Sequence, residues 1–255
     1  MPEPIPTEGS SGAEFGARTP WTAGAAAVFG VLTVATSMWI ASLAQPLHAG
    51  LGTWLARGRT TPGAELGQPY NMVITLLVVQ AVIIAMVWWG AARFGGERRR
   101  VLSLDRKLTL SAFLWGLAGM IALLAPYNIV MFTLWPGVFA ADMRPFWDLA
   151  RSPALGLAAV AVAAGAPLAE ELLFRGFLLP ALCKTRHGFI GAAVIASLGW
   201  TALHFYSIAG LIEVLLIGLY FSWLMWRHNN LLLPLSLHAL YNGGQLAALA
   251  LWPGT

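Results

Sequence analysis

Long apolar stretches alternate with short polar segments along most of this chain. Seven stretches are each close to the roughly 20 residues that a helix needs to cross the hydrocarbon core of a bilayer. They lie at about 22–44, 70–92, 108–134, 154–180, 188–208, 209–227 and 231–251. The fifth and sixth are adjacent, so we expect a tight turn near Ser207–Gly210 to join them. The pattern predicts an all-α fold: a multi-pass transmembrane helical bundle with about seven spans.

The composition supports a protein that faces lipid. Hydrophobic residues make up 58% of the chain and charged residues 10%, whereas soluble domains carry roughly 25% charged residues. We therefore expect an integral membrane protein in contact with the lipid bilayer. Residues 1–20 lack an apolar core and are expected to form a disordered tail. Residues 21–152 should hold the N-terminal transmembrane helices and a basic cytoplasmic loop.

The positive charges predict the orientation. If seven spans alternate, ten of the 15 Lys and Arg residues lie on the side of the N-terminus, four on the opposite side and one inside a span. The ten are Arg18, Arg93, Arg98, Arg99, Arg100, Arg106, Lys107, Lys184, Arg186 and Arg227, the four are Arg57, Arg59, Arg144 and Arg151, and the one is Arg175. The positive-inside rule places the N-terminus in the cytoplasm, and in a bacterium the membrane would be the plasma (inner) membrane. These charges share no single face, so we expect no nucleic-acid partner.

Ionisable residues are absent from the first three expected spans and gather in the later ones. A charge at mid-bilayer costs about 2.5–3.5 kcal/mol on insertion scales, so such residues are functional candidates. They are Glu170, Glu171 and Arg175 in the fourth span, His204 at the end of the fifth, and His238 with the polar Asn242 in the seventh. The i, i+4 spacing predicts an ion pair between Glu171 and Arg175. Glu170 points roughly 100° away from Glu171, toward a neighbouring helix.

Convergence of these helices would surround a small cavity with groups that activate water. A carboxylate takes a proton from water, a histidine orients the water, and Asn and His donate to an oxyanion. The same groups include a Glu/His/His set of the kind that binds zinc. Simpler interpretations are an ion pair that only packs the bundle and histidines that only bond between helices. Six polar residues over three spans favour a site.

The order of these residues resembles a known family. Glu170-Glu171-x-x-x-Arg175, a histidine on the next helix and His238-x-x-x-Asn242 resemble the CPBP family, the CAAX prenyl endopeptidase type II and bacteriocin-processing (Abi) intramembrane proteases. The resemblance covers residues 153–247, which we expect to be the catalytic core. The chain departs from the family at Trp200, where phenylalanine is usual, and we expect this change to alter packing more than chemistry.

The resemblance implies an intramembrane endopeptidase whose peptide or protein substrate enters from the membrane. By position, Glu170 matches the water-activating glutamate, Glu171 the second glutamate, and Arg175 the motif arginine. His204 matches the water-orienting histidine. His238 and Asn242 match the oxyanion pair. The family is classified among metalloproteases, but a metal-free glutamate mechanism has also been argued, so the cofactor stays open: one divalent metal such as zinc, held by Glu170, His204 and His238, or none. The alternatives are a non-catalytic immunity or scaffold protein and a small proton-coupled transporter.

Two features do not fit the simple pattern. Glu213, in the sixth stretch, matches no family motif, and it either lies near the outer interface or adds an acid to the cavity. His204 would lie toward the outer end of a straight fifth helix, whereas Glu170 and His238 lie nearer the middle of theirs. A kinked or displaced fifth helix would bring them to the same depth.

Overall fold

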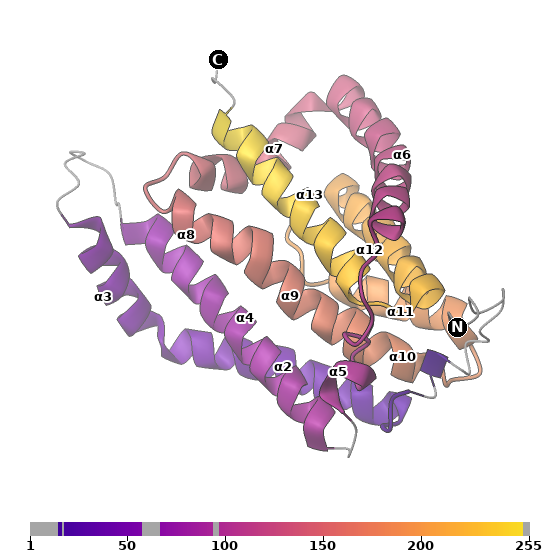
Figure 1. Cartoon of the computed structure of the whole chain (residues 1–255). Coiled ribbons are helices and arrows are strands. Elements are labelled where there is room, and N and C mark those ends of the chain that lie inside the picture. Colours follow the sequence, from indigo (N-terminus) through magenta and orange to yellow (C-terminus); the bar gives the residue numbers. More distant parts are fainter. Residues whose placement is uncertain (1–14, 17, 58–66, 94–96, 252–255) are drawn as a thin grey trace.

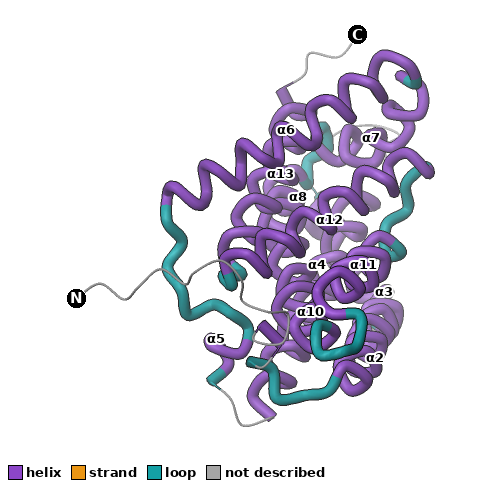
Figure 2. Tube along the Cα trace, turned by 90° about the vertical axis from the view of Figure 1, so that its right-hand side faces the viewer, coloured by secondary structure: helices purple, strands orange, loops and turns teal. Residues whose placement is uncertain are grey.

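The structure, a computed structural model, describes residues 15–16, 18–57, 67–93 and 97–251. Helices and loops account for this whole part of the chain (Figure 2), which confirms the all-α prediction. The helices before the central segment are α2 (Ala23–Leu43), α3 (Gln45–Ala56), α4 (Gly67–Arg93), α5 (Arg98–Val101), α6 (Leu110–Leu134) and α7 (Pro136–Ala150). Then come α8 (Leu155–Ala159), η1 (Val160–Gly165), α9 (Ala166–Glu170), η2 (Glu171–Leu178), α10 (Leu179–Leu182), α11 (Gly188–Thr201), α12 (Ile208–His228) and α13 (Leu232–Leu251).

Within the described residues, five helical segments are long and apolar enough to cross a membrane. They are Ala23–Leu43, Gln68–Arg93, Leu110–Leu134, Leu155–Leu182 and Ile208–His228. The other two expected spans are also helical, but α11 has only 14 residues, and the 20-residue α13 is not among the five. The chain is therefore a multi-pass integral membrane protein, and five of the seven expected stretches have the length and hydropathy of a span.

The fourth expected span is the centre of the bundle. Residues 155–182 run as one interrupted helix through α8, η1, α9, η2 and α10. In its most apolar window 56% of the residues are buried, against 17–39% in the other four candidate spans. Helices α4 and α13 lie on either side of the α8–α9 part (Figure 1). Helices α2, α11 and α12 pack against η2, so this segment is shielded from lipid on several sides.

Short polar side chains fix where several helices begin and end. The hydroxyls of Thr22, Thr109 and Ser207 each accept a hydrogen bond from the backbone N–H three residues later, as N-cap residues do. Asp142, in α7, accepts from both the N–H and the hydroxyl of Ser207 and so anchors the start of α12. Asn229 takes the left-handed conformation (φ 47°) and ends α12.

The connection between α11 and α12 differs from the prediction. The expected turn at Ser207–Gly210 lies earlier, because α11 already ends at Thr201 and α12 begins at Ile208. His204 is therefore in the loop and not in a helix. A 14-residue helix rises about 21 Å, well short of the ~30 Å hydrocarbon core. The shortened helix leaves His204 beside Trp200, whose indole donates to Glu170.

The expected N-terminal tail is only partly described. Residues 1–14 and 17 lie outside the described part of the chain. Phe15 and Thr19 are buried, and the ring of Trp21 stacks on Phe177 at 4.1 Å. Phe15 and Thr19, near the end of the expected tail, therefore pack on the bundle.

Candidate active site

Two π-helical segments interrupt the central helix on either side of Glu170. Glu170 is the last residue of α9, and Glu171 is the first of η2. π-Helical turns are rare and occur often at functional sites. In η1 the carbonyl of Ala161 accepts from the Gln80 amide at 3.0 Å, and the carbonyl of Val162 accepts from the Asn242 amide at 3.1 Å. Side chains from α4 and α13 thus hold the irregular turn from two sides.

Glu171 and Arg175 form the ion pair that their spacing predicts. Nη1 of Arg175 lies 2.8 Å from Oε1 of Glu171, and both side chains have no exposed surface. The guanidinium also donates to the carbonyl of Gly218 at 3.3 Å and lies 4.3 Å from the centre of the Trp200 ring. Arg175 is therefore fixed by a carboxylate, a backbone carbonyl and an aromatic face.

His238 lies between the two glutamates. Its Nδ1 is 3.0 Å from Oε1 of Glu171, and its Nε2 is 3.8 Å from Oε2 of Glu170. A carboxylate oxygen can only accept, so the Nδ1 position must carry the proton when Glu171 is ionised. The second nitrogen is left facing Glu170. The histidine of α13 is thereby oriented by one glutamate and aimed toward the other.

Glu170 differs from Glu171 in its access to solvent. Its side chain is 24% exposed, compared with 0% for Glu171 and 4% for His238. Its Oε2 accepts a 2.6 Å hydrogen bond from the indole Nε1 of Trp200. Phenylalanine has no N–H to donate, so tryptophan at this position adds a hydrogen bond to Glu170. Sequence reasoning missed this bond because helical spacing says nothing about which side chains meet between helices.

His204 approaches this group through Trp200. Its Nδ1 lies 3.0 Å from the Trp200 carbonyl, and its ring packs edge-on against the indole with 5.1 Å between centroids. Tyr206, two residues on, has a ring 5.7 Å from that of His204. Burial raises the pKa of the Tyr206 hydroxyl well above its usual range, and the negative charges of Glu170, Asp142 and Glu213 raise it further. This hydroxyl therefore remains protonated at the edge of the cluster.

Asn242 and Glu213 are engaged elsewhere in this structure. Asn242 shares a helix with His238, but its amide donates to η1 and not toward the glutamates. Oε1 of Glu213 accepts hydrogen bonds of 2.6 Å from both Asn128 and Tyr241. Glu213 is thus fixed between α6, α12 and α13 near the start of α12. These contacts favour the position near the helix end over that of an extra acid beside Glu170.

The residues considered for a metal do not form a ligand set. Zinc ligands surround one point at about 2.0–2.3 Å. Across the described ranges, no group of three His, Cys, Asp or Glu side chains is arranged to hold an ion. Nδ1 of His204 faces a carbonyl, and Oε2 of Glu170 is occupied by the indole N–H. The fit of Glu170, His204 and His238 to zinc is therefore poor in this geometry, and no chemical step is assigned to a metal.

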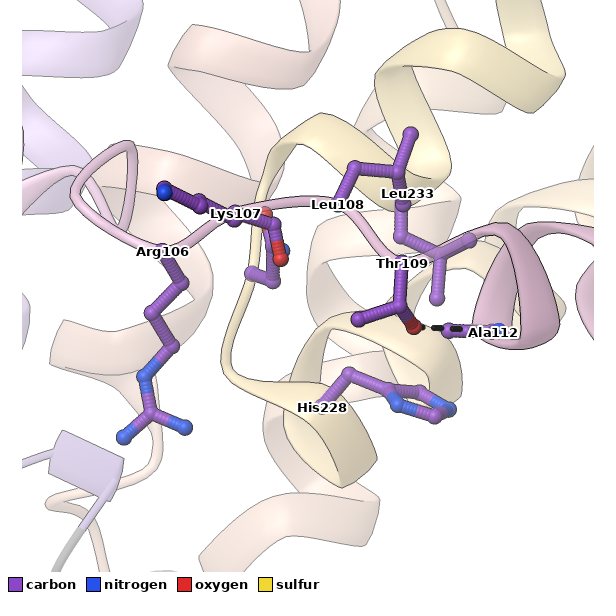
Figure 3. Close-up of a pocket in the computed structure, with 8 residues that line it drawn as sticks. Arg106, Lys107, Leu108, Thr109, Ala112, His228 and Leu233 are labelled. Atoms are coloured by element: carbon purple, nitrogen blue, oxygen red, sulfur yellow. Dashed lines mark hydrogen bonds between the residues drawn. The ribbon is translucent and has the colours of Figure 1, made fainter. Parts of the chain in front are cut away.

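A pocket of about 160 Å³ lies apart from these residues (Figure 3). It is lined by the segment before α6 and by residues around the α12–α13 turn, including Arg106, Lys107, Thr109 and His228. Figure 3 shows Arg106 and Lys107 on one side of the view and the imidazole of His228 on the other. None of the six expected site residues lines it, so this pocket, between the start of α6 and the α12–α13 turn, is not part of the candidate site.

Apolar spans around a buried glutamate–arginine–histidine group define an integral membrane protein with a polar site inside the bundle. Residues 152–244 match the profile of the type II CAAX prenyl endopeptidase Rce1-like family. This stretch of the chain is similar to that family, in agreement with the resemblance stated from the motifs, and it contains all six expected site residues. Comparisons with curated proteins and with solved structures gave no match. The family match supports an intramembrane protease of the CAAX type.

Proposed function

We propose that this protein is an intramembrane endopeptidase in which Glu170 activates water for hydrolysis of a peptide bond. The observation that carries the proposal is the contrast between the two adjacent glutamates. Glu171 is fully buried and bound by Arg175 and His238, whereas Glu170 keeps a partly exposed side chain. A general base must reach its water, so Glu170 is the better placed carboxylate.

In the proposed reaction, Glu170 removes a proton from water while the water oxygen attacks the carbonyl carbon of the substrate. The new C–O bond converts the carbonyl into a tetrahedral oxyanion. Collapse of this intermediate breaks the C–N bond, and the proton held by Glu170 passes to the leaving amine. Nδ1 of His204 faces a carbonyl, which can only accept, so the neutral ring has a free Nε2 with which to orient the water.

Two groups of α13 are proposed as oxyanion donors. When both ring nitrogens of His238 carry a proton, Nε2 can donate as well as Nδ1. Its Nε2–H is then a charge-assisted donor near Glu170. The amide of Asn242 has two N–H donors, and only one contact, to Val162, occupies it here. The second N–H is the one assigned to the oxyanion.

The test compares purified full-length protein with Glu170→Gln on a panel of prenylated and non-prenylated C-terminal peptides in detergent and in liposomes. We expect cleavage by the wild type and background cleavage by Glu170→Gln at unchanged folded yield. Near-normal cleavage of a verified substrate by Glu170→Gln would refute the assignment. Substrate binding without cleavage would favour a scaffold, and proton-coupled flux a transporter. Chelator inhibition that zinc reverses would assign His204 and His238 to metal binding instead.

The orientation of the bundle is also a proposal. The basic segment around α5 and the short loop after α10 are proposed to face the cytoplasm, with the N-terminus on the same side, because ten of the 15 Lys and Arg residues fall there. In a bacterium this would be the plasma membrane. The proposed peptide substrate then reaches Glu170 from within the bilayer.

A further inference from the structure

Trp200 contacts more of the candidate site than any other aromatic residue described above. Its indole N–H donates to Glu170 at 2.6 Å, and its carbonyl lies 3.0 Å from Nδ1 of His204. Its ring faces the Arg175 guanidinium at 4.3 Å and meets the His238 ring edge-on at 5.4 Å. One residue therefore touches both members of the proposed water-activating pair.

The surrounding fold is shaped to accept an indole at this position. Trp200 is only 2% exposed, although it is one of the largest side chains. A Cβ placed on Gly218 of α12 would come within 3.0 Å of both the Trp200 ring and the Ser197 side chain, so the absence of a side chain at Gly218 makes room for the ring. The carbonyl of the same glycine accepts from Arg175. The indole is thus held on one face by α12 and on another by the guanidinium.

We propose that Trp200 is a positioning residue, which fixes the rotamer of Glu170 through the indole N–H. The bond occupies Oε2 and leaves Oε1 to face the water. Phenylalanine, usual at this position in the family that the motifs resemble, fills the space but cannot supply the donor. The expected effect of Trp200 on kcat rests on the proposed peptidase function, whereas its effect on the position of Glu170 rests on geometry alone.

The test separates the N–H from the ring. Trp200→Phe removes the donor and part of the ring. Benzothienylalanine, introduced at position 200 by amber suppression, keeps the bicyclic shape and replaces the N–H with sulfur. The same replacement at Trp223, which is 43% exposed, is the matched control. If the donor matters, both position-200 variants lose about 10- to 100-fold in kcat with little change in KM, as expected for a hydrogen bond to a charged group. The Trp223 control keeps normal turnover.

A second readout needs no substrate. Dicyclohexylcarbodiimide reacts with accessible protonated carboxyl groups, and mass spectrometry of the full-length protein in detergent follows the adduct on Glu170, which Glu170→Gln cannot form. We expect severalfold faster labelling of Glu170 in both position-200 variants, because the carboxylate loses its donor. Wild-type labelling and turnover in the benzothienylalanine protein would overturn the proposal and leave Trp200 a packing residue. Faster labelling in a protein that cleaves nothing would support the contact and refute the peptidase function.

Discussion

Replacement of Glu171 by alanine should destabilise the protein as well as inactivate it. The side chains of Glu171 and Arg175 are both fully buried, 2.8 Å apart, and the same carboxylate oxygen is 3.0 Å from Nδ1 of His238. Glu171→Ala leaves the guanidinium without its counter-ion. Removing one partner of a buried pair costs roughly 3–5 kcal/mol in soluble proteins. At about 2–4 °C per kcal/mol for a chain of this size, the unfolding midpoint should fall by roughly 6–20 °C.

The assay is thermal unfolding of the full chain in detergent, with monomeric yield after size exclusion as a second measure. Glu171→Gln is the matched variant, because it keeps an oxygen acceptor for Arg175 and His238 but lacks the charge, and we expect it to lose less stability. Glu171→Ala combined with Arg175→Ala should recover part of the loss, since no charge is then stranded. An unchanged midpoint and yield for Glu171→Ala would refute the pairing as a stabilising contact.

Three further predictions concern topology, the oxyanion and the packing around the indole. Cysteine introduced at Arg99 should label from the cytoplasm and cysteine at Arg144 from outside, in a chain whose single native cysteine is buried; labelling of position 99 from outside would mean that the topology is inverted. Asn242→Ala should retain measurable cleavage at about 10²–10³-fold lower kcat, the usual loss for one oxyanion donor, and full activity would remove Asn242 from that role. Gly218→Val should lower the free energy of unfolding by about 1–3 kcal/mol through overpacking, whereas Gly137→Val, where a Cβ meets nothing within 4 Å, should show no such clash; equal thermal midpoints for the two variants would contradict the tight fit.

The sequence predicted those features that depend on local geometry or on bulk hydropathy. Apolar stretches predicted helices correctly, because a backbone in lipid must satisfy its own hydrogen bonds. The pair of Glu171 and Arg175 followed from i, i+4 spacing on a single helix. The roles of Glu170, His204 and Asn242 are proposals, which the cleavage assays of their variants test.

Which side chains meet between helices could not be predicted from the sequence. The donor from Trp200 to Glu170 depends on how α11 packs against the central helix, and neither hydropathy nor spacing encodes that register. The early end of α11 was also missed, because the apolar run continues past Thr201 into the loop. Asn242 was expected to face the same oxyanion as His238 because the two residues share a helix face, and spacing alone did not show that its amide also donates to the Val162 carbonyl. The π-helical turn that presents the Val162 carbonyl has no signature that the residues alone reveal.

The bond from Gln80 to Ala161 has a consequence for protein engineering. Gln80 belongs to α4, which precedes the stretch at residues 152–244 that matches the Rce1-like family, and its amide donates to the carbonyl of Ala161 in η1. A chimera that grafts this stretch onto unrelated membrane helices would lose the hydrogen bond from Gln80, and only the backbone N–H of Ala166 would then donate to the Ala161 carbonyl. Carrying α4 along, or recreating an amide donor at the position of Gln80, would keep the contact.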